Sequence, residues 1–304
     1  MYNYPNHLPE HTDRSLWKYE DIFNTSNKFK LVKCYMHTVD TILGMHSHSF
    51  YELNIVISGT GRHYIDDGSC LATEGMVFML PPNTRHGYYS DGIMKIYHIL
   101  LSGAFCERFS DELTSLSGYS LFFEVEPLLR GRYTQDFFLK LEKEKLDELI
   151  KTLENLKLTD SSEENNVQIA RNAATLKILC EFCSLMAKRH NGLNLNQYNN
   201  VFETEIIKNM QFLVDNCCEK QDFNKIAAEL NMSYATYLRY FKQICGKTPS
   251  QYITQCRINH AKKLLKFTDR TIVEIAIECG FFDSSHFVKV FKQFTGLNPK
   301  QFRN

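Results

Sequence analysis

Long apolar runs are absent from this 304-residue sequence. The longest, such as Met76–Leu80, fall far short of the roughly 20 residues that span a bilayer. The N-terminal segment, MYNYPNHLPEHTDRS, has no apolar stretch of the kind that a secretory signal requires. We therefore expect a soluble, cytoplasmic protein with no membrane partner, and the length predicts two domains.

Cysteine pairs at the spacing of a zinc finger are also lacking. The ten cysteines are spread thinly from Cys34 to Cys279, and the one CxxC, Cys180 to Cys183, falls within a helical pattern. A structural zinc site takes four ligands, so a single pair does not make one. We expect reduced thiols, with the CxxC pair used for packing.

The formal net charge is zero, but the two signs are distributed unevenly. From Phe223 onward there are 13 Lys and Arg against 5 Asp and Glu, a net charge of +8. A basic segment at one end of a neutral chain indicates a polyanionic partner that binds only there.

The spacing of hydrophobic residues divides the rest of the chain. Residues 30–102 alternate short β-rich runs with turn signals, which is typical of a sandwich or barrel. Around 140–157 and 166–190 the spacing becomes helical. We expect these helices to form a dimer seam or, alternatively, to cap the barrel. Four leucines share one face of the first helix: Leu146, Leu149, Leu153 and Leu156.

An asparagine-rich segment, 191–200, follows these helices, and we interpret it as a linker. It separates an N-terminal domain, 1–190, from a C-terminal domain, 201–304. In the C-terminal domain, residues of about 222–245 and 271–295 each predict a short helix, a tight turn and a second helix.

These two segments are an internal repeat. A shift of 50 residues places 241–243, Phe-Lys-Gln, on the identical 291–293. Upstream of the turn the shift is 49, and the inserted Phe282 accounts for the difference. The first turn has Asn231 where the second has Gly280, and Asn also adopts the left-handed conformation. The organisation is that of a helix-turn-helix, so we predict DNA binding.

On these residues the chain resembles the AraC/XylS family of bacterial transcription regulators, from about Val201 to Arg303. The matching residues extend over both copies and include Ile226-Ala227, Met232-Ser233, Phe241-Lys242, Gly246-Lys-Thr-Pro249, Arg257, Ile275-Ala276, Gly280-Phe281, Ser285, Phe287, Phe291-Lys292 and Pro299. The resemblance implies a module that binds a double-stranded DNA operator.

The front half resembles the cupin-type sensor domain common in this family. Two spacings carry the likeness, with Asn83 for the usual Gly in the second: His46-Ser-His48-x3-Glu52-x6-Gly59 and Gly75-x5-Pro81-x-Asn83-x2-His86. The resemblance implies a β-barrel pocket, helices that dimerise, and an effector that changes how the pair sits on DNA.

Three roles remain open for the quartet His46, His48, Glu52 and His86. Imidazole and carboxylate suit Fe, Mn, Ni or Zn, so one role is a divalent metal site. The others are lining an effector pocket and packing within the barrel. Because a similar set holds a catalytic ion in metal-binding cupins, a cupin metalloenzyme is the alternative function. With a DNA-binding module attached, we predict no enzyme, no catalytic residue and no required cofactor.

The second helix of each copy should turn its aromatic residues to the core: Tyr237 and Phe241 with Ile244 in the first, and Phe287, Phe291 and Phe294 in the second. The remaining positions, several of them carried over from the family, are the candidates for DNA contact: Ala235, Leu238, Arg239, Lys242, Ser284, Ser285, Val288, Lys289 and Lys292. Leu238 and Val288 occupy the same slot of the repeat. They are either exposed to thymine methyl groups or rotated into the core.

The sequence thus predicts an N-terminal cupin-like β-barrel with flanking dimerisation helices and a C-terminal all-α tandem helix-turn-helix domain. Together they would form a homodimeric transcription regulator. By family analogy its effector is a sugar or a related carbon source. RNA polymerase is a further partner if the protein activates transcription. Trp17, the only tryptophan, lies in an N-terminal arm and either covers the effector as a lid or pins the arm to the barrel.

Overall fold

The computed structural model divides into two compact units, Met1–Gly192 and Leu193–Asn304. It describes Leu8, Phe23, 26–65, 68–130, 138–191 and 201–303. Trp17 and residues 192–200 of the predicted linker lie outside the described residues. Within that described part of the chain, no helix is long and apolar enough to cross a membrane.

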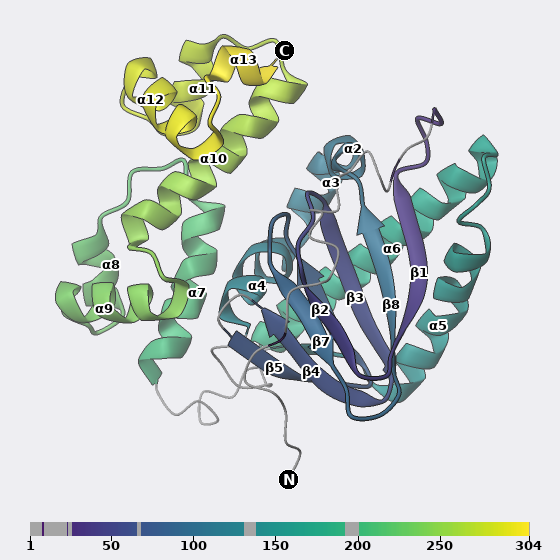
Figure 1. Ribbon diagram of the computed structural model, residues 1–304. Coiled ribbons are helices and arrows are strands. Elements are labelled where there is room, and N and C mark those ends of the chain that lie inside the picture. The colour runs from purple at the N-terminus through teal and green to yellow at the C-terminus, as the bar shows by residue number, and fades with distance from the viewer. Residues whose placement is uncertain are drawn as a thin grey trace. The chain divides into compact units, whose positions relative to one another are not determined.

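The N-terminal unit contains two antiparallel sheets (Figure 1). One has the strand order β1-β8-β3-β6-β9 and the other the order β2-β7-β4-β5. The strands are β1 Val32–Val39, β2 Ile42–His46, β3 Tyr51–Ser58, β4 Thr60–Ile65, β5 Gly68–Thr73, β6 Met76–Leu80, β7 His86–Tyr89, β8 Met94–Leu101 and β9 Leu139–Lys140. The β-rich N-terminal domain expected from residues 30–102 is confirmed.

The interior of this unit has an apolar part and a polar part. Val56, Phe78 and Ile96 belong to one fully buried apolar cluster that draws on both sheets. Tyr88 belongs to the same cluster, but its hydroxyl accepts a hydrogen bond from Asn54 Nδ2 at 3.0 Å. Tyr88 therefore marks the boundary beyond which polar side chains line the interior.

Two positive-φ residues shape the loops around the sheets. Gly59 has φ +84°, and a Cβ there would lie 2.3 Å from the carbonyl oxygen of Ile93, so only glycine fits. Asn83 takes φ 66°, which explains how it replaces the glycine of the second cupin spacing. Its amide donates to the carbonyl of His48 at 2.7 Å, which joins two segments that carry candidate site residues.

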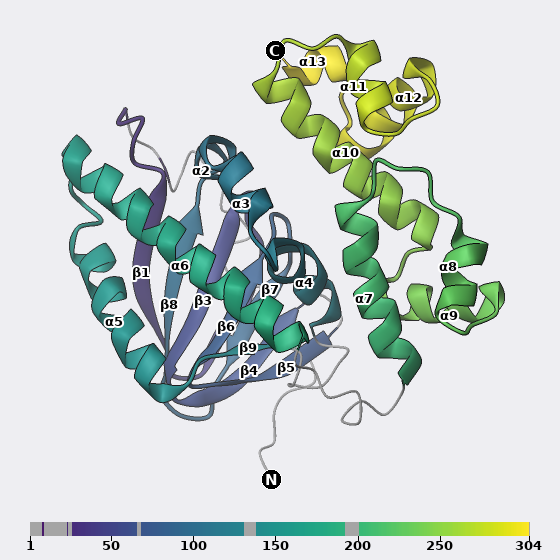
Figure 2. The ribbon, with the colours of Figure 1, turned by 180° about the vertical axis from the view of Figure 1, so that it is seen from behind.

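Six further elements lie in the described residues of this unit, and α5 and α6 lie across the five-stranded sheet (Figure 2). They are α2 Gly103–Arg108, α3 Ser110–Ser115, η1 Leu121–Val125, α4 Glu126–Leu129, α5 Lys143–Leu158 and α6 Asn165–Asn191. Arg171 of α6 donates to the carbonyl of Val32 on β1 at 3.1 Å and pairs with Asp160 at 2.6 Å. These bonds fix α6 to the barrel.

The four leucines of α5 that were predicted as a dimer seam do not face outward. All four leucines of its apolar face are buried within the single chain: Leu146, Leu149, Leu153 and Leu156. The alternative, that this helix caps the barrel, is the arrangement found, because α5 packs against β1. An apolar helix face does not distinguish a partner subunit from the chain's own sheet.

The C-terminal unit is entirely helical in its described residues. Its helices are α7 Val201–Asp215, α8 Phe223–Glu229, α9 Tyr234–Cys245, α10 Pro249–Phe267, α11 Ile272–Glu278, α12 Ser284–Thr295 and α13 Pro299–Arg303. The offset between α8 and α11 is 49 residues, and that between α9 and α12 is 50, as the repeat predicts.

The turns and caps repeat as well. Asn231 has φ 55° and Gly280 has φ 74°, so both copies turn through a left-handed residue. Asp222 caps α8 and Thr271 caps α11, the first helix of each copy. Ser233 caps α9 by accepting from the amide of Thr236. Asp283 caps α12 by accepting from the amide of His286.

Helix α10 belongs to two cores. Its Tyr252 ring packs against Phe241 of α9, with ring centroids 5.6 Å apart. Further along, Ile258 and Leu265 pack in a second buried cluster with Phe287 of α12. The prediction that Phe294 joins this cluster is wrong, because the side chain is 38% exposed near the C-terminal end of α12.

Candidate functional site

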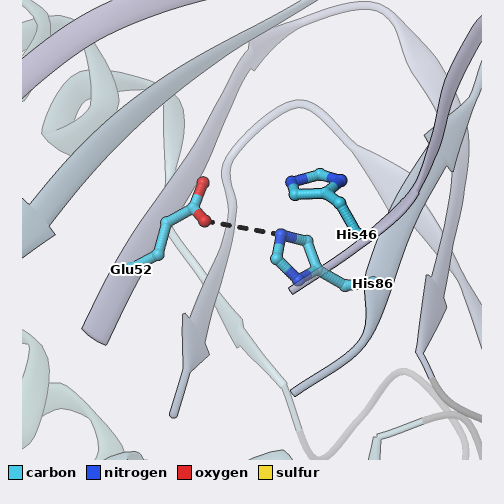
Figure 3. A group of neighbouring side chains, drawn as sticks. All are labelled: His46, Glu52 and His86. Atoms are coloured by element: carbon cyan, nitrogen blue, oxygen red, sulfur yellow. Dashed lines mark ion pairs between the residues drawn. The ribbon is translucent and has the colours of Figure 1, made fainter. Parts of the chain in front are cut away.

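Three polar side chains meet inside the N-terminal barrel. Glu52 comes from β3 of one sheet, whereas His46 and His86 are cross-strand neighbours on β2 and β7 of the other. Their ligand atoms lie within 4.8 Å of one another, and all three residues are buried (Figure 3). The structure thus brings together three members of the sequence-predicted quartet.

His48, the fourth member, contacts the same carboxylate. Its Nε2 lies 2.5 Å from Glu52 Oε2, and His86 Nε2 lies 3.4 Å from that oxygen. His98 of β8 hydrogen-bonds through Nδ1 to the other oxygen, Oε1. Burial raises the pKa of Glu52, but the imidazoles of His48, His86 and His98 beside it outweigh burial and hold the pKa well below its ordinary value. Glu52 is therefore an ionised carboxylate among imidazoles.

Backbone carbonyls fix how three of the rings are protonated. The Nδ1 atoms of His46, His48 and His86 lie 2.9, 2.8 and 3.1 Å from the carbonyl oxygens of Gly44, Phe50 and Thr84, respectively. A carbonyl oxygen only accepts hydrogen bonds, so each Nδ1 carries a proton. In the neutral ring, Nε2 then carries no proton and presents a lone pair. Burial also lowers the pKa of His46 to about 3, which keeps this ring neutral at ordinary pH.

Two histidines at the site are missing from the sequence prediction. His98 contacts Glu52, and His63 of β4 stacks on Tyr88 with centroids 4.3 Å apart. Burial lowers the pKa of His63 well below its ordinary value, so this ring is neutral. A sequence feature that could have identified His98 is a histidine within an otherwise apolar strand, Ile96-Tyr-His98-Ile-Leu100. Such a residue needs a polar partner once it is buried.

In the C-terminal unit, the nine candidates for DNA contact lie on α9 and α12. Six are exposed: Ala235, Arg239, Lys242, Ser285, Lys289 and Lys292. Three are half-buried: Leu238, Ser284 and Val288. Val288 packs against the second core. Since Leu238 and Val288 are both half-buried, neither full exposure nor full burial describes their equivalent positions.

Phe282, next to the start of α12, is also exposed. The residue is 96% exposed, the highest value among the large hydrophobic side chains described, and it directly precedes the cap of α12. His286, in the first turn of α12, is also exposed. The repeat identified Phe282 only as an insertion and gave no reason to expect an exposed aromatic ring.

Comparisons with known families agree with this division of the chain. The model of the AraC-like ligand binding domain matches residues 36–163, and the model of a helix-turn-helix domain matches residues 226–304. Together the two matches span more than half of the sequence. The chain belongs to the AraC family of transcription regulators. It is a DNA-binding regulator with a ligand-binding domain, as the sequence predicts.

Individual relatives are similar over most of the chain. The HTH-type transcriptional activator RhaS of Escherichia fergusonii is 25% identical over 258 residues, which cover 85% of this chain and 86% of the relative. RhaS of Mannheimia succiniciproducens is 26% identical over 284 residues, 93% of this chain and 97% of the relative. Nothing in these similarities supports the alternative of a cupin metalloenzyme.

A solved structure matches the C-terminal part. It is a transcriptional regulator from Chromobacterium violaceum with an AraC-type DNA-binding domain, 31% identical, and the match covers 34% of this chain and 88% of that one. Its TM-score of 0.30 is too low to add a structural argument.

Proposed function

We propose that α9 and α12 are the two DNA-reading helices of this AraC-family regulator. The observation that carries the proposal is the repeated exposure of basic side chains on the faces opposite the buried aromatic residues. Arg239 and Lys242 lie on α9, and Lys289 and Lys292 occupy the same slots on α12. A helix in the major groove presents such residues to base edges and phosphates. Ala235, Leu238, Ser284, Ser285 and Val288 complete the proposed surface.

The N-terminal barrel is the proposed site of the effector, and its polar interior would bind it. Buried Asn54, His63 and His98 have polar atoms without a hydrogen-bond partner among the described residues. Such atoms are costly unless a ligand or water satisfies them. Donors and acceptors of this kind suit a hydroxylated molecule, so a sugar or a related carbon source is the proposed effector class. His46, His48, Glu52 and His86 would line the same site.

The proposed active species is a homodimer in the cytoplasm, where its DNA lies, and an activating form would also contact RNA polymerase. Because the leucines of α5 are buried, the proposed subunit interface uses other residues. The outward face of α6 offers Ile169, which is 47% exposed, beside exposed Ala170 and Ala173. Ile169→Asp should therefore weaken dimerisation, as measured by light scattering, whereas Leu149→Asp should unfold the barrel.

The experiment that tests this function begins with selection of an operator from random DNA by the purified protein. Binding to that operator and to random DNA is then measured with and without a panel of sugars. Arg239→Ala should lose operator affinity. Lys151→Ala, which removes one positive charge at an exposed position of α5, should not. Failure to enrich any sequence, or equal losses in both variants, would overturn the proposal.

A further inference from the structure

We propose that the N-terminal barrel binds one divalent transition-metal ion through Nε2 of His46, Nε2 of His86 and the carboxylate of Glu52 (Figure 3). The ion deepens the proposed function, since it would sit where the effector is proposed to bind. Metal binding is nevertheless measured on the protein alone, so it fails or succeeds independently of DNA binding.

The distances suit one ion. Imidazole nitrogen and carboxylate oxygen bind such ions at about 2.0–2.2 Å, so two ligand atoms on one ion lie about 3.0–3.4 Å apart. His86 Nε2 and Glu52 Oε2 are 3.4 Å apart, and the rings of His46 and His86 have centroids 4.3 Å apart. The three ligand atoms lie within 4.8 Å of one another, so the widest pair would have to close by at most about 1.8 Å to share one ion.

The ring orientations also match those of metal ligands. A histidine that binds a metal usually donates its other N–H to a carbonyl or a carboxylate, which fixes its tautomer. His46 donates to Gly44 and His86 donates to Thr84, and both carbonyls lie two residues before the ring. These bonds leave Nε2 as the coordinating atom on each ring.

The arrangement without an ion leaves polar atoms unsatisfied. His48 Nε2, His86 Nε2 and Glu52 Oε2 have no matched donor and acceptor among the described residues. Each Nδ1 already carries the proton of the neutral ring, so the nitrogen lone pairs face a carboxylate oxygen. Only an extra proton or a cation between them removes this conflict. A proton on the imidazoles is therefore the competing explanation that the experiment must exclude.

The ligand types set the class of ion. Two imidazoles and one carboxylate suit Mn²⁺, Fe²⁺, Co²⁺, Ni²⁺ or Zn²⁺ better than Ca²⁺ or Mg²⁺, which prefer oxygen ligands. Three protein ligands leave coordination positions open, and hydroxyl oxygens of an effector could fill them. His48 and His98 hold the carboxylate of Glu52 from the side, so we assign them positioning roles.

The test uses full-length protein that has been stripped with a chelator and titrated with Co²⁺, Zn²⁺ or Mn²⁺. We expect one ion per chain by elemental analysis, visible d–d absorption with Co²⁺, and a higher melting temperature that tracks saturation. Glu52→Gln and His86→Ala should lose the Co²⁺ spectrum. His260→Gln, which changes a half-buried histidine on α10 of the C-terminal unit, should retain it.

Two results would overturn the metal site. One is wild-type protein that binds none of the three ions stoichiometrically, which would leave a proton as the explanation. The other is folded Glu52→Gln protein, by circular dichroism, with an unchanged Co²⁺ spectrum. If Glu52→Gln does not fold, the wild-type titration and the His86→Ala spectrum decide. Sugar-dependent operator binding by metal-free protein would leave the regulatory function intact while removing the ion from it.

Discussion

The two helix-turn-helix copies have the same backbone arrangement but expose different side chains. Helices α9 and α12, the proposed DNA-reading helices, each follow a side-chain cap and end at a left-handed glycine, Gly246 or Gly296. The first copy exposes Ala235 and Arg239, whereas the second exposes serine and lysine in those slots and adds an aromatic ring at Phe282. Buried residues thus maintain a common frame, and the outward residues are free to give each copy its own DNA preference.

The largest expected effect concerns the turn residue. Gly280→Ala places a Cβ at φ +74°, only 2.2 Å from the carbonyl oxygen of Cys218, so backbone must move. We expect a loss of roughly 2–4 kcal/mol in the free energy of unfolding. Asn231→Gly, the matched change in the first copy, should stay within about 0.5 kcal/mol. Urea unfolding of both variants would show whether the two turns differ; equal small effects would contradict the steric argument.

The next effect separates the two basic residues in equivalent slots. The Arg239 guanidinium lies 4.9 Å from the Tyr240 ring centroid, which limits its freedom, and its planar fork can bind a guanine edge in a bidentate manner. Arg239→Ala should cost about 1–3 kcal/mol on the selected operator and relax the preference at one base pair. Lys289→Ala should cost less and act more evenly across sequences.

Binding measured at several salt concentrations provides the check. Loss of a phosphate contact lowers the salt dependence of affinity, whereas loss of a base contact mainly lowers the ratio of specific to random binding. If Arg239→Ala weakens both DNAs equally, the residue contacts phosphate and the distinction between the copies fails at this slot.

A smaller effect is expected at the residue that only the second copy has. Phe282→Ser should leave stability within about 0.5 kcal/mol, because the ring is almost fully exposed. Partial burial of the ring against DNA would contribute about 1 kcal/mol to operator binding. Ile277→Ser, which changes an exposed residue of α11, is the matched control. Equal affinities for both variants would remove Phe282 from the DNA surface.

The smallest effect concerns the half-buried slot. Val288→Ala removes methyl groups that pack against the second core, so we expect about 0.5–1 kcal/mol less stability. Leu238→Ala should behave alike if the slot is structural in both copies. A change in base preference at constant stability would instead assign Leu238 to thymine contacts, and operator selection with each variant distinguishes these outcomes.

Local signals made the helical unit predictable from sequence. The left-handed turn at Asn231 and the helix-turn-helix pattern that recurs after 50 residues each depend on nearby residues, and both appear where expected. The prediction for Phe294 was wrong because helical spacing shows which way a side chain points, but not whether a neighbouring helix extends far enough to cover it.

The barrel was less predictable because its contacts link distant segments. The spacing of His46, Glu52 and His86 indicated a site, and the structure brings them together. His98 could not be added, since its contact with Glu52 depends on the pairing of β3 with β8. The leucines of α5 were misassigned for a related reason: one sequence cannot tell which of two apolar surfaces a helix face will cover.

Helix α10 has a consequence for the spacing of the operator. Because one continuous helix contributes to both cores, it should hold the two proposed DNA-reading helices at a fixed spacing. Each base pair inserted between their sites would rotate one site by about 35° around the DNA axis. Helices held at a fixed spacing cannot follow that rotation, so the two binding sites would have to keep the same angular relation around the DNA axis. The operator should therefore tolerate substitutions between its two sites far better than insertions there.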